Sequence, residues 1–588
     1  MSQSSSSSPS ASLGIIRWYD LAISAIWAII GFGLFMRVWG LGAEGLRLDE
    51  SQSVWQAMHS LDFIREYMLK NVHLPLHNSL LHLWMLLFGP SEASVRTLAL
   101  IPGILSVPAL YFLAREFIRP RWALYATAIA ALSPFWVWYS REIRMYSLLT
   151  LITIFSYYAY VKILKENRVR WYVLYALVNI VGMYTHYFFF LILLVQLVYF
   201  FLTWRVRFSD RPPGEQVGEK RTMLRRFVLV GAVLVAGFVP WLYLLVTNYG
   251  SGSLAPILEK PDAFNVILQF YEFMFGFHTD TLTASLVGGW PILILGSFFF
   301  LSKRAPSSPL ILLLPVGILL PVAIGFIASQ YLPLFLSRYF IIVTPLLFIF
   351  VAWFIGELPT RSRIAVGGVF LAVLSVLLIN QSIDPRVPTR ENYREATQYI
   401  SSQVGPRDIV VASPPYLVYP TQYYYHGDAM LTTYPIWDKR KGGIPAITDE
   451  ILEQDLRAIK VGHSRIFFLV STDLYGSKES KTYLDTHLTK IAKHQFSKNL
   501  WVHVYQAEYA SKASPTPTGE SWAESEEIPK GMIHVVAPGE TLSKITFRYY
   551  GDYLQLSRIQ KINGIRDPKI IHPGDILSIP EITPQKVL

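Results

Sequence analysis

Several ionisable residues lie at the ends of long apolar stretches, where a charged side chain is unusual. The segment 140–146 (Ser-Arg-Glu-Ile-Arg-Met-Tyr) places two arginines and a glutamate directly against such a stretch. Arg141 and Arg144 are one helical turn apart, so we expect them to bind one anionic group together. Comparable positions at the ends of apolar stretches are held by Asp49, Glu50, His73, Glu142, His186 and Arg338.

Each of these residues also has an ordinary structural interpretation. Asp49 would cap a helix that begins at Ser51. Arginines beside an apolar stretch can extend their charged ends toward the membrane surface, and this applies to Arg338 as well. His186 would then be one of the ring-bearing residues that gather at membrane interfaces. The sequence leaves these alternatives open.

Two histidines have the spacing of metal ligands. His73 and His77 are four residues apart, but Pro75 lies between them and no third ligand is evident. The chain has no Cys, which excludes disulfides and thiolate metal sites. We therefore predict no metal site and no cofactor, although the sequence leaves a divalent metal open.

Composition shows what must position these residues. The 588 residues are 52% hydrophobic and only 16% charged, whereas a soluble domain carries about 25% charged residues. Long apolar runs fill residues 20–380, and residues 384–588 have the composition of soluble protein. A polytopic helical membrane protein with soluble C-terminal domains is therefore predicted, and disordered, collagen-like and soluble single-domain classes are excluded.

About eleven segments are long and apolar enough to cross a bilayer. They are 20–39, 93–114, 121–139, 145–163, 170–186, 188–204, 227–247, 284–301, 309–327, 339–357 and 364–381. The segment 73–89 is apolar but short, so we expect a helix at the membrane interface there.

The distribution of Lys and Arg predicts the orientation. With a cytoplasmic N-terminus, nineteen of these residues fall in cytoplasmic loops and nine in the opposite short loops. The net charge of +11 thus needs no nucleic-acid partner. We expect a multi-pass protein of the plasma or inner membrane, with everything after Asn380 outside the cytoplasm. The ionisable residues named above then share the outer face, which predicts an outward-facing active site.

The predicted domains follow from shifts in composition. Residues 1–19 are expected to be a disordered cytoplasmic N-terminus, and 20–383 the transmembrane domain. A small extracytoplasmic α/β domain is predicted at 384–510, with a helix at 392–404 and strands at 408–412, 465–470 and 499–505. Residues 511–530 are a Ser/Pro/Glu-rich linker. A further compact domain is predicted at residues 531–581.

Six short motifs follow one another along the chain, namely Arg47–Ser51, His73–Leu76, Ser91–Arg96, Ser140–Tyr146, Thr185–Tyr187 and Arg338-Tyr339. Together, over residues 20–510, they resemble the C-type glycosyltransferase (GT-C) superfamily. The similarity is greatest to the branch of protein O-mannosyltransferases and bacterial aminoarabinose-transferase-like enzymes. The chain departs from the family in two respects: the family more often has His-Pro-Pro-Leu where His-Leu-Pro-Leu stands here, and many relatives carry an aromatic residue in place of His77.

The resemblance implies a reaction as well as a fold. The donor would be a sugar on a polyprenyl phosphate, and an acceptor hydroxyl on a glycan, lipid or protein would attack its anomeric carbon. Asp49 would act as general base, with Glu50 and Glu142 orienting the acceptor or the sugar. The lipid phosphate would be bound by cationic and hydrogen-bonding groups, namely Arg141, Arg144, Tyr146, Arg338, His73 and His186.

In residues 531–581, a short strand, a Pro-Gly turn, two helices and a closing strand ending in Ile-Pro predict the order βααβ. This pattern resembles a LysM domain. The resemblance implies binding of N-acetylglucosamine-containing glycans such as peptidoglycan, unless the fold is only a spacer. The expected binding residues are Gly539, Glu540, Thr541, Leu542, Ile571, His572, Pro573 and Gly574.

Two other functions fit the same composition. A transporter or flippase for lipid-linked sugars would usually show internal repeats and broken helices near the bilayer midplane, and the sequence shows no repeat. An inactive membrane anchor that presents the LysM domain would have no need for Asp49 or Glu142.

Overall fold

The computed structural model describes residues 10–71, 73–204, 213–248, 260–277, 309–332, 334–384, 390–439 and 445–507, and parts of 531–580. The chain divides into two compact units. The first, termed the membrane unit, consists of Met1–Glu44 and Gln52–Arg390. The second, termed the C-terminal unit, consists of Gly45–Ser51 and Glu391–Leu588.

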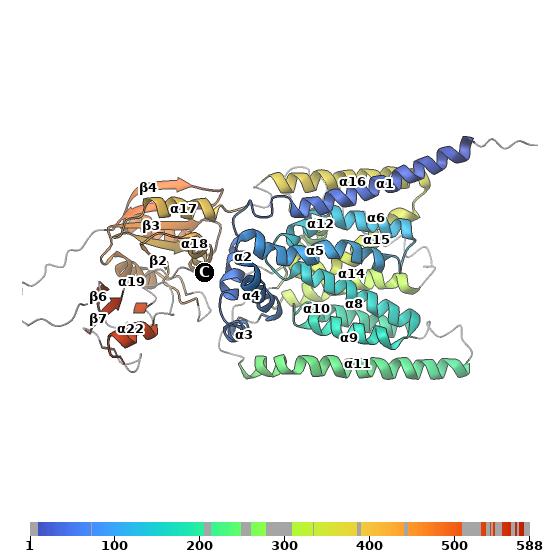
Figure 1. The fold of residues 1–588 in the computed structure, drawn as a ribbon, viewed down its shortest axis with the longest axis horizontal. Coiled ribbons are helices and arrows are strands. Elements are labelled where there is room, and N and C mark those ends of the chain that lie inside the picture. Colours follow the sequence, from blue (N-terminus) through green and yellow to red (C-terminus); the bar gives the residue numbers. More distant parts are fainter. Residues whose placement is uncertain are drawn as a thin grey trace, which may run out of the picture. The chain divides into compact units, whose positions relative to one another are not determined.

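The membrane unit is built from helices that pack around one apolar core. Figure 1 shows the long helices lying side by side, with α3 and α4 gathered at one end of the bundle. In chain order the helices are α1 (Ser10–Val38), α2 (Leu48–Ala57), α3 (Leu61–Lys70), α4 (Leu76–Phe88), α5 (Glu92–Ala114), α6 (Pro120–Leu132), α7 (Pro134–Ser140), α8 (Tyr146–Glu166), α9 (Val169–Met183), α10 (Phe189–Thr203), α11 (Pro213–Thr247), α12 (Ala263–Phe275), η2 (Pro309–Leu312), α14 (Leu313–Ser329), η3 (Ser337–Val343), α15 (Thr344–Glu357) and α16 (Thr360–Ile383).

Within the described residues, six helical segments are long and apolar enough to cross a membrane. They are Glu92–Ala114, Tyr146–Glu166, Val217–Thr247, Pro309–Ser329, Ser337–Glu357 and Thr360–Ile383. Five further apolar helices are shorter, so the predicted count of about eleven spans is not confirmed. The predicted span at 284–301 lies outside the described residues.

The first helix begins earlier than predicted. It starts at Ser10 and so takes in residues 10–19, for which the sequence predicted disorder. Leu13, Ile15 and Ile16 extend the apolar pattern of the predicted span toward the N-terminus, and this pattern favours a longer helix.

The predicted span 121–139 is broken into α6 and α7 at Ser133-Pro134. Proline has no N–H, so the carbonyl of Ala130 loses its usual helical partner. Arg37 of α1, which is fully buried, supplies the missing donors. Its guanidinium donates to the carbonyls of Ala130 at 2.8 Å and Ala131 at 2.6 Å. The break therefore fixes α1 to α6 and starts the short helix that leads to Arg141 and Glu142.

Two loops of the membrane unit contain helices of their own. The loop after α1 holds α3 and α4, and α4 lies at the predicted interfacial segment 73–89. The predicted loop 247–283 holds α12, which sequence analysis did not predict. The side chain of Asp262 and that of Asn265 cap the start of α12 reciprocally, and Gly276, with φ +80°, ends it.

The C-terminal unit contains the predicted α/β domain. Its five-stranded sheet has the order β2-β1-β3-β5-β4. β1 pairs in parallel with β2 and β3, and β5 pairs antiparallel with β3 and β4. The predicted helix and three strands are present as α17 (Tyr393–Gln403), β1 (Ile409–Ser413), β3 (Arg465–Ser471) and β5 (Leu500–Gln506). The other elements of this domain are η4 (Pro415–Leu417), α18 (Val418–Tyr424), β2 (Met430–Thr433), α19 (Asp449–Lys460), α20 (Ser477–His487) and β4 (Thr489–Gln495).

The LysM region has a small core of its own. β6 (Gly531–Val535) pairs antiparallel with β7 (Ile576–Pro580), and α22 (Leu556–Ile562) packs on β7. Asn563 fixes this arrangement, because its amide donates to the carbonyl of Ser578 at 2.7 Å and accepts from the N–H of Ser578 at 2.6 Å. The predicted linker 511–530 lies outside the described residues.

Candidate active site

The segment between α7 and α8 carries Glu142 and Arg144, and its start is set by packing against α5. Gly103 of α5 lies so close to Ser140 that a Cβ on the glycine would be 2.3 Å from the Cβ of Ser140. Residues 141–145 are not helical. The spacing of Arg141 and Arg144 predicted that they would be neighbours on a helix face, and this prediction is wrong. The two arginines also have different surroundings.

Two tyrosines form the centre of the site. The rings of Tyr139 and Tyr146 meet edge to face, with centroids 5.0 Å apart. Glu142, Arg338 and Glu272 lie near enough to Tyr139 to act on its hydroxyl electrostatically. Tyr146 is influenced in the same way by three of the predicted site residues, namely Glu142, Arg144 and Arg338. The fold thus gathers carboxyl and guanidinium groups from three separate chain segments around this tyrosine pair.

His186 joins the same group from the turn between α9 and α10. Its ring centroid lies 6.2 Å from that of Tyr146 and 5.1 Å from that of Tyr339. Burial lowers the pKa of His186 to about 3, and positive charge on His73, Arg338 and Arg144 lowers it further. The ring is therefore neutral near pH 7. Its Nδ1 accepts from the N–H of Phe188 at 3.1 Å, which leaves the hydrogen on Nε2.

Glu272 of α12 is a carboxyl group that sequence reasoning missed. Its side chain accepts a hydrogen bond from Ser337, the residue directly before Arg338. Burial raises the pKa of this carboxyl above its usual value. The caps of α12, at Asp262 and Gly276, were the signals that could have revealed a helix here. The charged cluster, as defined here, is Glu142, Arg144, His186, Glu272 and Arg338 around Tyr139 and Tyr146.

The two histidines of the first loop have different environments. His73 is exposed, and it lies near enough to His186 to act on it electrostatically. His77 is buried on α4, where its Nδ1 lies 3.1 Å from Oδ1 of Asn78. Burial and the guanidinium of Arg144 lower the pKa of His77 to about 4, against the effect of Asn78. In the part of the chain that the structure describes, no three His, Asp or Glu residues are arranged to hold a metal ion.

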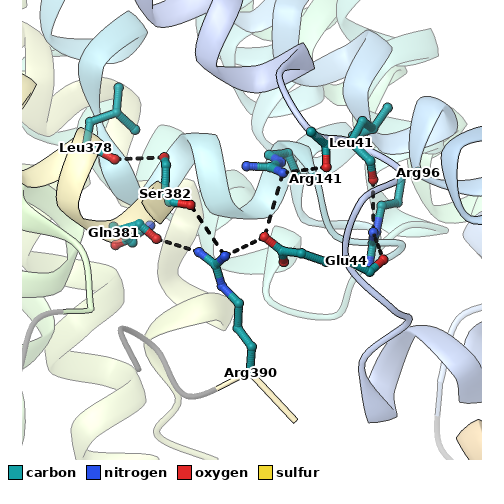
Figure 2. A network of polar contacts seen from close by, with 9 residues as sticks. Leu41, Glu44, Arg96, Arg141, Leu378, Gln381, Ser382 and Arg390 are labelled. Atoms are coloured by element: carbon teal, nitrogen blue, oxygen red, sulfur yellow. Dashed lines mark hydrogen bonds and ion pairs between the residues drawn. The ribbon is translucent and has the colours of Figure 1, made fainter. Parts of the chain in front are cut away.

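Arg141 belongs to a different network. Its guanidinium donates to the carbonyl of Gly40 at 3.1 Å and lies 3.9 Å from the carboxylate of Glu44. Figure 2 shows that Glu44 also forms an ion pair with Arg390. In the same network, the guanidinium of Arg96 donates to the main-chain carbonyls of Leu41 and Glu44. These contacts place Arg141 among groups that hold the loop after α1. The local geometry therefore favours a structural role for Arg141, and not the expected binding of one anion together with Arg144.

Asp49 and Glu50 lie in the first turn of α2, in the short segment that belongs to the C-terminal unit. Glu50 is fully buried, and its carboxylate accepts from the N–H of Arg47 at 2.9 Å. The helix begins at Leu48 and not at Ser51, so Asp49 is its second residue and does not occupy the position before the helix that was expected for it. Glu50, the third residue, reaches back to the N–H of Arg47, as a glutamate does in a capping box. Asp49 is half-buried and acts electrostatically on Tyr393 of α17. Its relation to the charged cluster stays a prediction.

The charged cluster has the chemistry that a phosphate-bearing ligand needs. Arg144 and Arg338 provide two permanent positive charges, and Arg338 also lies over the ring of Tyr339, at 5.9 Å from its centroid. Glu142 provides a buried carboxylate beside them. Neutral phenol and imidazole groups complete the surroundings. Such a site can bind an anion through the guanidinium groups and donate further hydrogen bonds to it.

The predicted glycan-binding residues of the LysM region are described only in part. Thr541, Leu542, Ile571 and His572 lie within the described residues, and Leu542 is buried in the LysM core. His572 is exposed, and its backbone N–H donates to the carboxylate of Asp575 at 2.7 Å. The remaining predicted residues, Gly539, Glu540, Pro573 and Gly574, lie outside the described residues.

Two families match parts of the chain. Residues 72–214 match the family described as Dolichyl-phosphate-mannose-protein mannosyltransferase, and residues 534–580 match the LysM domain. An uncharacterized protein of Deinococcus radiodurans is 44% identical over 48 residues, which are 8% of this chain. The match spans only 19% of that relative's length.

Solved structures show the same fold across most of the chain. ArnT from Cupriavidus metallidurans in the apo state gives a TM-score of 0.52 at 14% identity, covering 84% of this chain and 98% of ArnT. ArnT bound to undecaprenyl phosphate gives 0.51 at 14% identity, covering 85% and 99%. With the family matches, this likeness confirms the predicted fold. The chain is a multi-pass membrane protein that carries the GT-C glycosyltransferase fold and a LysM domain near its C-terminal end.

Proposed function

We propose that this protein is an integral-membrane glycosyltransferase that moves a sugar from a polyprenyl-phosphate donor to an acceptor hydroxyl at the outer face of the cell membrane. The observation that carries the proposal is the charged cluster. Segments from α7–α8, the α9–α10 turn, α12 and η3 bring Glu142, Arg144, His186, Glu272 and Arg338 around one tyrosine pair. Charged groups that are buried, as Glu142 is, or half-buried, as Arg144 and Arg338 are, are costly, so a fold that gathers them is expected to use them.

The donor's phosphate is assigned to Arg144 and Arg338. ArnT, whose fold is similar, has been solved with undecaprenyl phosphate bound. These two half-buried guanidinium groups would neutralise the phosphate as the bond to the sugar breaks. His186, neutral with its hydrogen on Nε2, and Tyr146 would add uncharged hydrogen-bond donors.

The proposed transfer is a single displacement. The acceptor oxygen forms a bond to the anomeric carbon while the bond from that carbon to the phosphate oxygen breaks. The phosphate leaves with the bonding electron pair, and its negative charge is met by Arg144 and Arg338. Asp49 takes the acceptor's proton as general base, and Glu142 orients the acceptor or the sugar.

The LysM region is assigned to peptidoglycan, which would keep the enzyme beside the cell wall. The match at residues 534–580 supports this assignment. The full-length protein should sediment with insoluble peptidoglycan, and a variant that ends at Ala507 should not. Equal sedimentation of both would contradict a glycan-binding role for the region.

The catalytic proposal is tested with purified protein and a panel of polyprenyl-phosphate sugars, with products read by mass. We expect one donor to be consumed with formation of a glycosylated acceptor. Asp49→Asn should abolish transfer while the protein stays folded. Asp62→Asn is the matched control, because Asp62 is also a first-turn aspartate in the same loop but is exposed and paired with Arg65 at 3.3 Å.

The alternatives predict other outcomes of the same assay. A flippase would move labelled donor across a vesicle membrane without forming a product. An inactive anchor would do neither. Transfer by Asp49→Asn at the wild-type rate would contradict the assignment of Asp49 as base.

A further inference from the structure

The chain passes between its two compact units at three points, and Asp49 lies between two of them. Glu44 is the last residue of the membrane unit before the segment Gly45–Ser51, and Arg390 is the last before the α/β domain. Asp49, the proposed base, therefore lies in the seven-residue segment Gly45–Ser51, which belongs to the C-terminal unit. Whatever fixes this segment also fixes Asp49.

Glu44 and Arg390 form an ion pair within the membrane unit. The guanidinium of Arg390 also donates to the carbonyls of Gln381 and Ser382 at the end of α16, as Figure 2 shows. The main-chain carbonyl of Glu44 accepts from Arg96 at 2.8 Å. The side chains of Glu44 and Arg390 are only 26% and 14% exposed, so solvent screens the pair weakly. One ion pair thus joins two of the points where the chain leaves the membrane unit.

Tyr424, at the end of α18, holds the segment from within the C-terminal unit. Its hydroxyl accepts a hydrogen bond from the N–H of Leu46 at 2.6 Å, and Leu46 is fully buried. A Cβ on Gly45 would be 3.3 Å from the Cβ of Arg394 and 3.4 Å from the hydroxyl of Tyr424. The segment is therefore in close contact with the α/β domain three residues before Asp49.

We propose that Tyr424 and the Glu44–Arg390 pair are positioning residues for Asp49, and that holding the base-bearing segment is one task of the α/β domain. This inference rests on the proposed function, because it assumes that Asp49 is the base. A base must lie within hydrogen-bond reach of the acceptor's proton, and small misplacements cost large factors in rate. The donor's phosphate is bound by other residues, so loosening the segment should lower kcat and leave the donor KM unchanged.

The principal test compares two neighbouring tyrosines in the full-length protein. Tyr424→Phe removes only the hydroxyl that accepts from Leu46. Tyr425→Phe is the matched control, because the hydroxyl of Tyr425 instead donates to the carbonyl of Ala429 at 2.9 Å. We expect Tyr424→Phe to lower kcat roughly tenfold to 100-fold with an unchanged donor KM, and to speed hydrogen exchange at the amide of Leu46. Tyr425→Phe should change neither quantity.

A double-mutant cycle tests the ion pair. Glu44→Gln and Arg390→Gln should each lower kcat, and the double variant should lose less than the sum of the two single losses, because the two residues share one contact beside their separate ones. Strictly additive losses would contradict a shared role. Wild-type kcat and wild-type exchange at Leu46 in Tyr424→Phe would overturn the assignment of Tyr424.

The two proposals fail in different ways. If Asp49→Asn keeps full activity while Tyr424→Phe still releases the amide of Leu46, the base assignment is wrong and the anchoring contact stands. If Asp49→Asn is inactive but the Tyr424 and Glu44–Arg390 variants behave as wild type, Asp49 is needed and its positioning has another source.

Discussion

Gly103→Ala is predicted to damage catalysis by adding a single methyl group outside the charged cluster. In the structure, a Cβ at this position would lie 2.3 Å from the Cβ of Ser140. Ordinary contacts between such atoms begin at 3.4 Å, so the end of α7 would have to move about 1 Å away from α5. Ser140 is followed directly by Arg141 and Glu142. The displacement is therefore passed to the charged cluster.

The expected size of the effect follows from the same geometry. Overpacking of a core costs about 1–3 kcal/mol, which the better helix propensity of alanine offsets by about 1 kcal/mol. A misplacement of about 1 Å at the reacting groups can lower the rate roughly 100-fold. We therefore expect a modest loss of thermal stability and a much larger loss of transfer activity.

Gly231→Ala is the matched control for this prediction. Gly231 lies within α11, and a Cβ there would meet no atom within 4 Å. This variant should keep full activity and be as stable as the wild type or slightly more stable. The assay measures kcat/KM for the lipid-linked donor and the apparent Tm in detergent for both variants. Gly103→Ala with the activity and the Tm of Gly231→Ala would refute the reasoning.

Two other predictions concern stability. Arg37→Gln should lower the unfolding free energy by on the order of 3 kcal/mol, because the carbonyls of Ala130 and Ala131 lose charged donors. The loss is measured as a decrease in the apparent Tm, and an unchanged Tm would contradict this prediction. Burial lowers the pKa of His503 on β5 from 6.5 to about 4, so protonation favours the unfolded domain and stability is lost as the pH falls below about 6.5. At pH 5 the loss should be about 2 kcal/mol, measured by hydrogen exchange of β3 and β5 after correction for intrinsic rates. His503→Phe should lose this pH dependence, and a variant that keeps it would show that another group is responsible.

The sequence predicted the fold class well because the signals were long and periodic. Apolar runs of about 20 residues marked the helices α5, α8 and α16, and buried strands marked the α/β domain. The break in the predicted span 121–139 was missed, although Ser133-Pro134 has the form of a helix cap followed by proline at the first helical position. That break matters, because it creates the helix that leads to Glu142.

The site was predicted less completely than the fold. Positions at span ends predicted Glu142, Arg144, His186 and Arg338, and the family resemblance implied Tyr146; the structure brings these residues together. Helical spacing was misleading for Arg141, since residues 141–145 do not form a helix.

Two other features were missed for different reasons. The caps of α12 were signals for its helix, but Glu272 itself lies between aromatic residues and belongs to no motif that marks it as a site residue. The hold of Tyr424 on Leu46 joins residues 378 positions apart, which no local pattern reveals.

The most direct test of the central claim is the equilibrium affinity of the purified protein for undecaprenyl phosphate. Arg338→Gln removes one guanidinium from the charged cluster, and charge-assisted hydrogen bonds contribute about 1.5–3 kcal/mol each. The affinity should therefore fall roughly tenfold or more. Arg363→Gln is the control, because Arg363 donates to the carbonyl of Leu358 at 2.7 Å at the other end of α16 from Gln381. Equal affinities of Arg338→Gln, Arg363→Gln and the wild type would contradict the claim that the charged cluster binds the lipid phosphate.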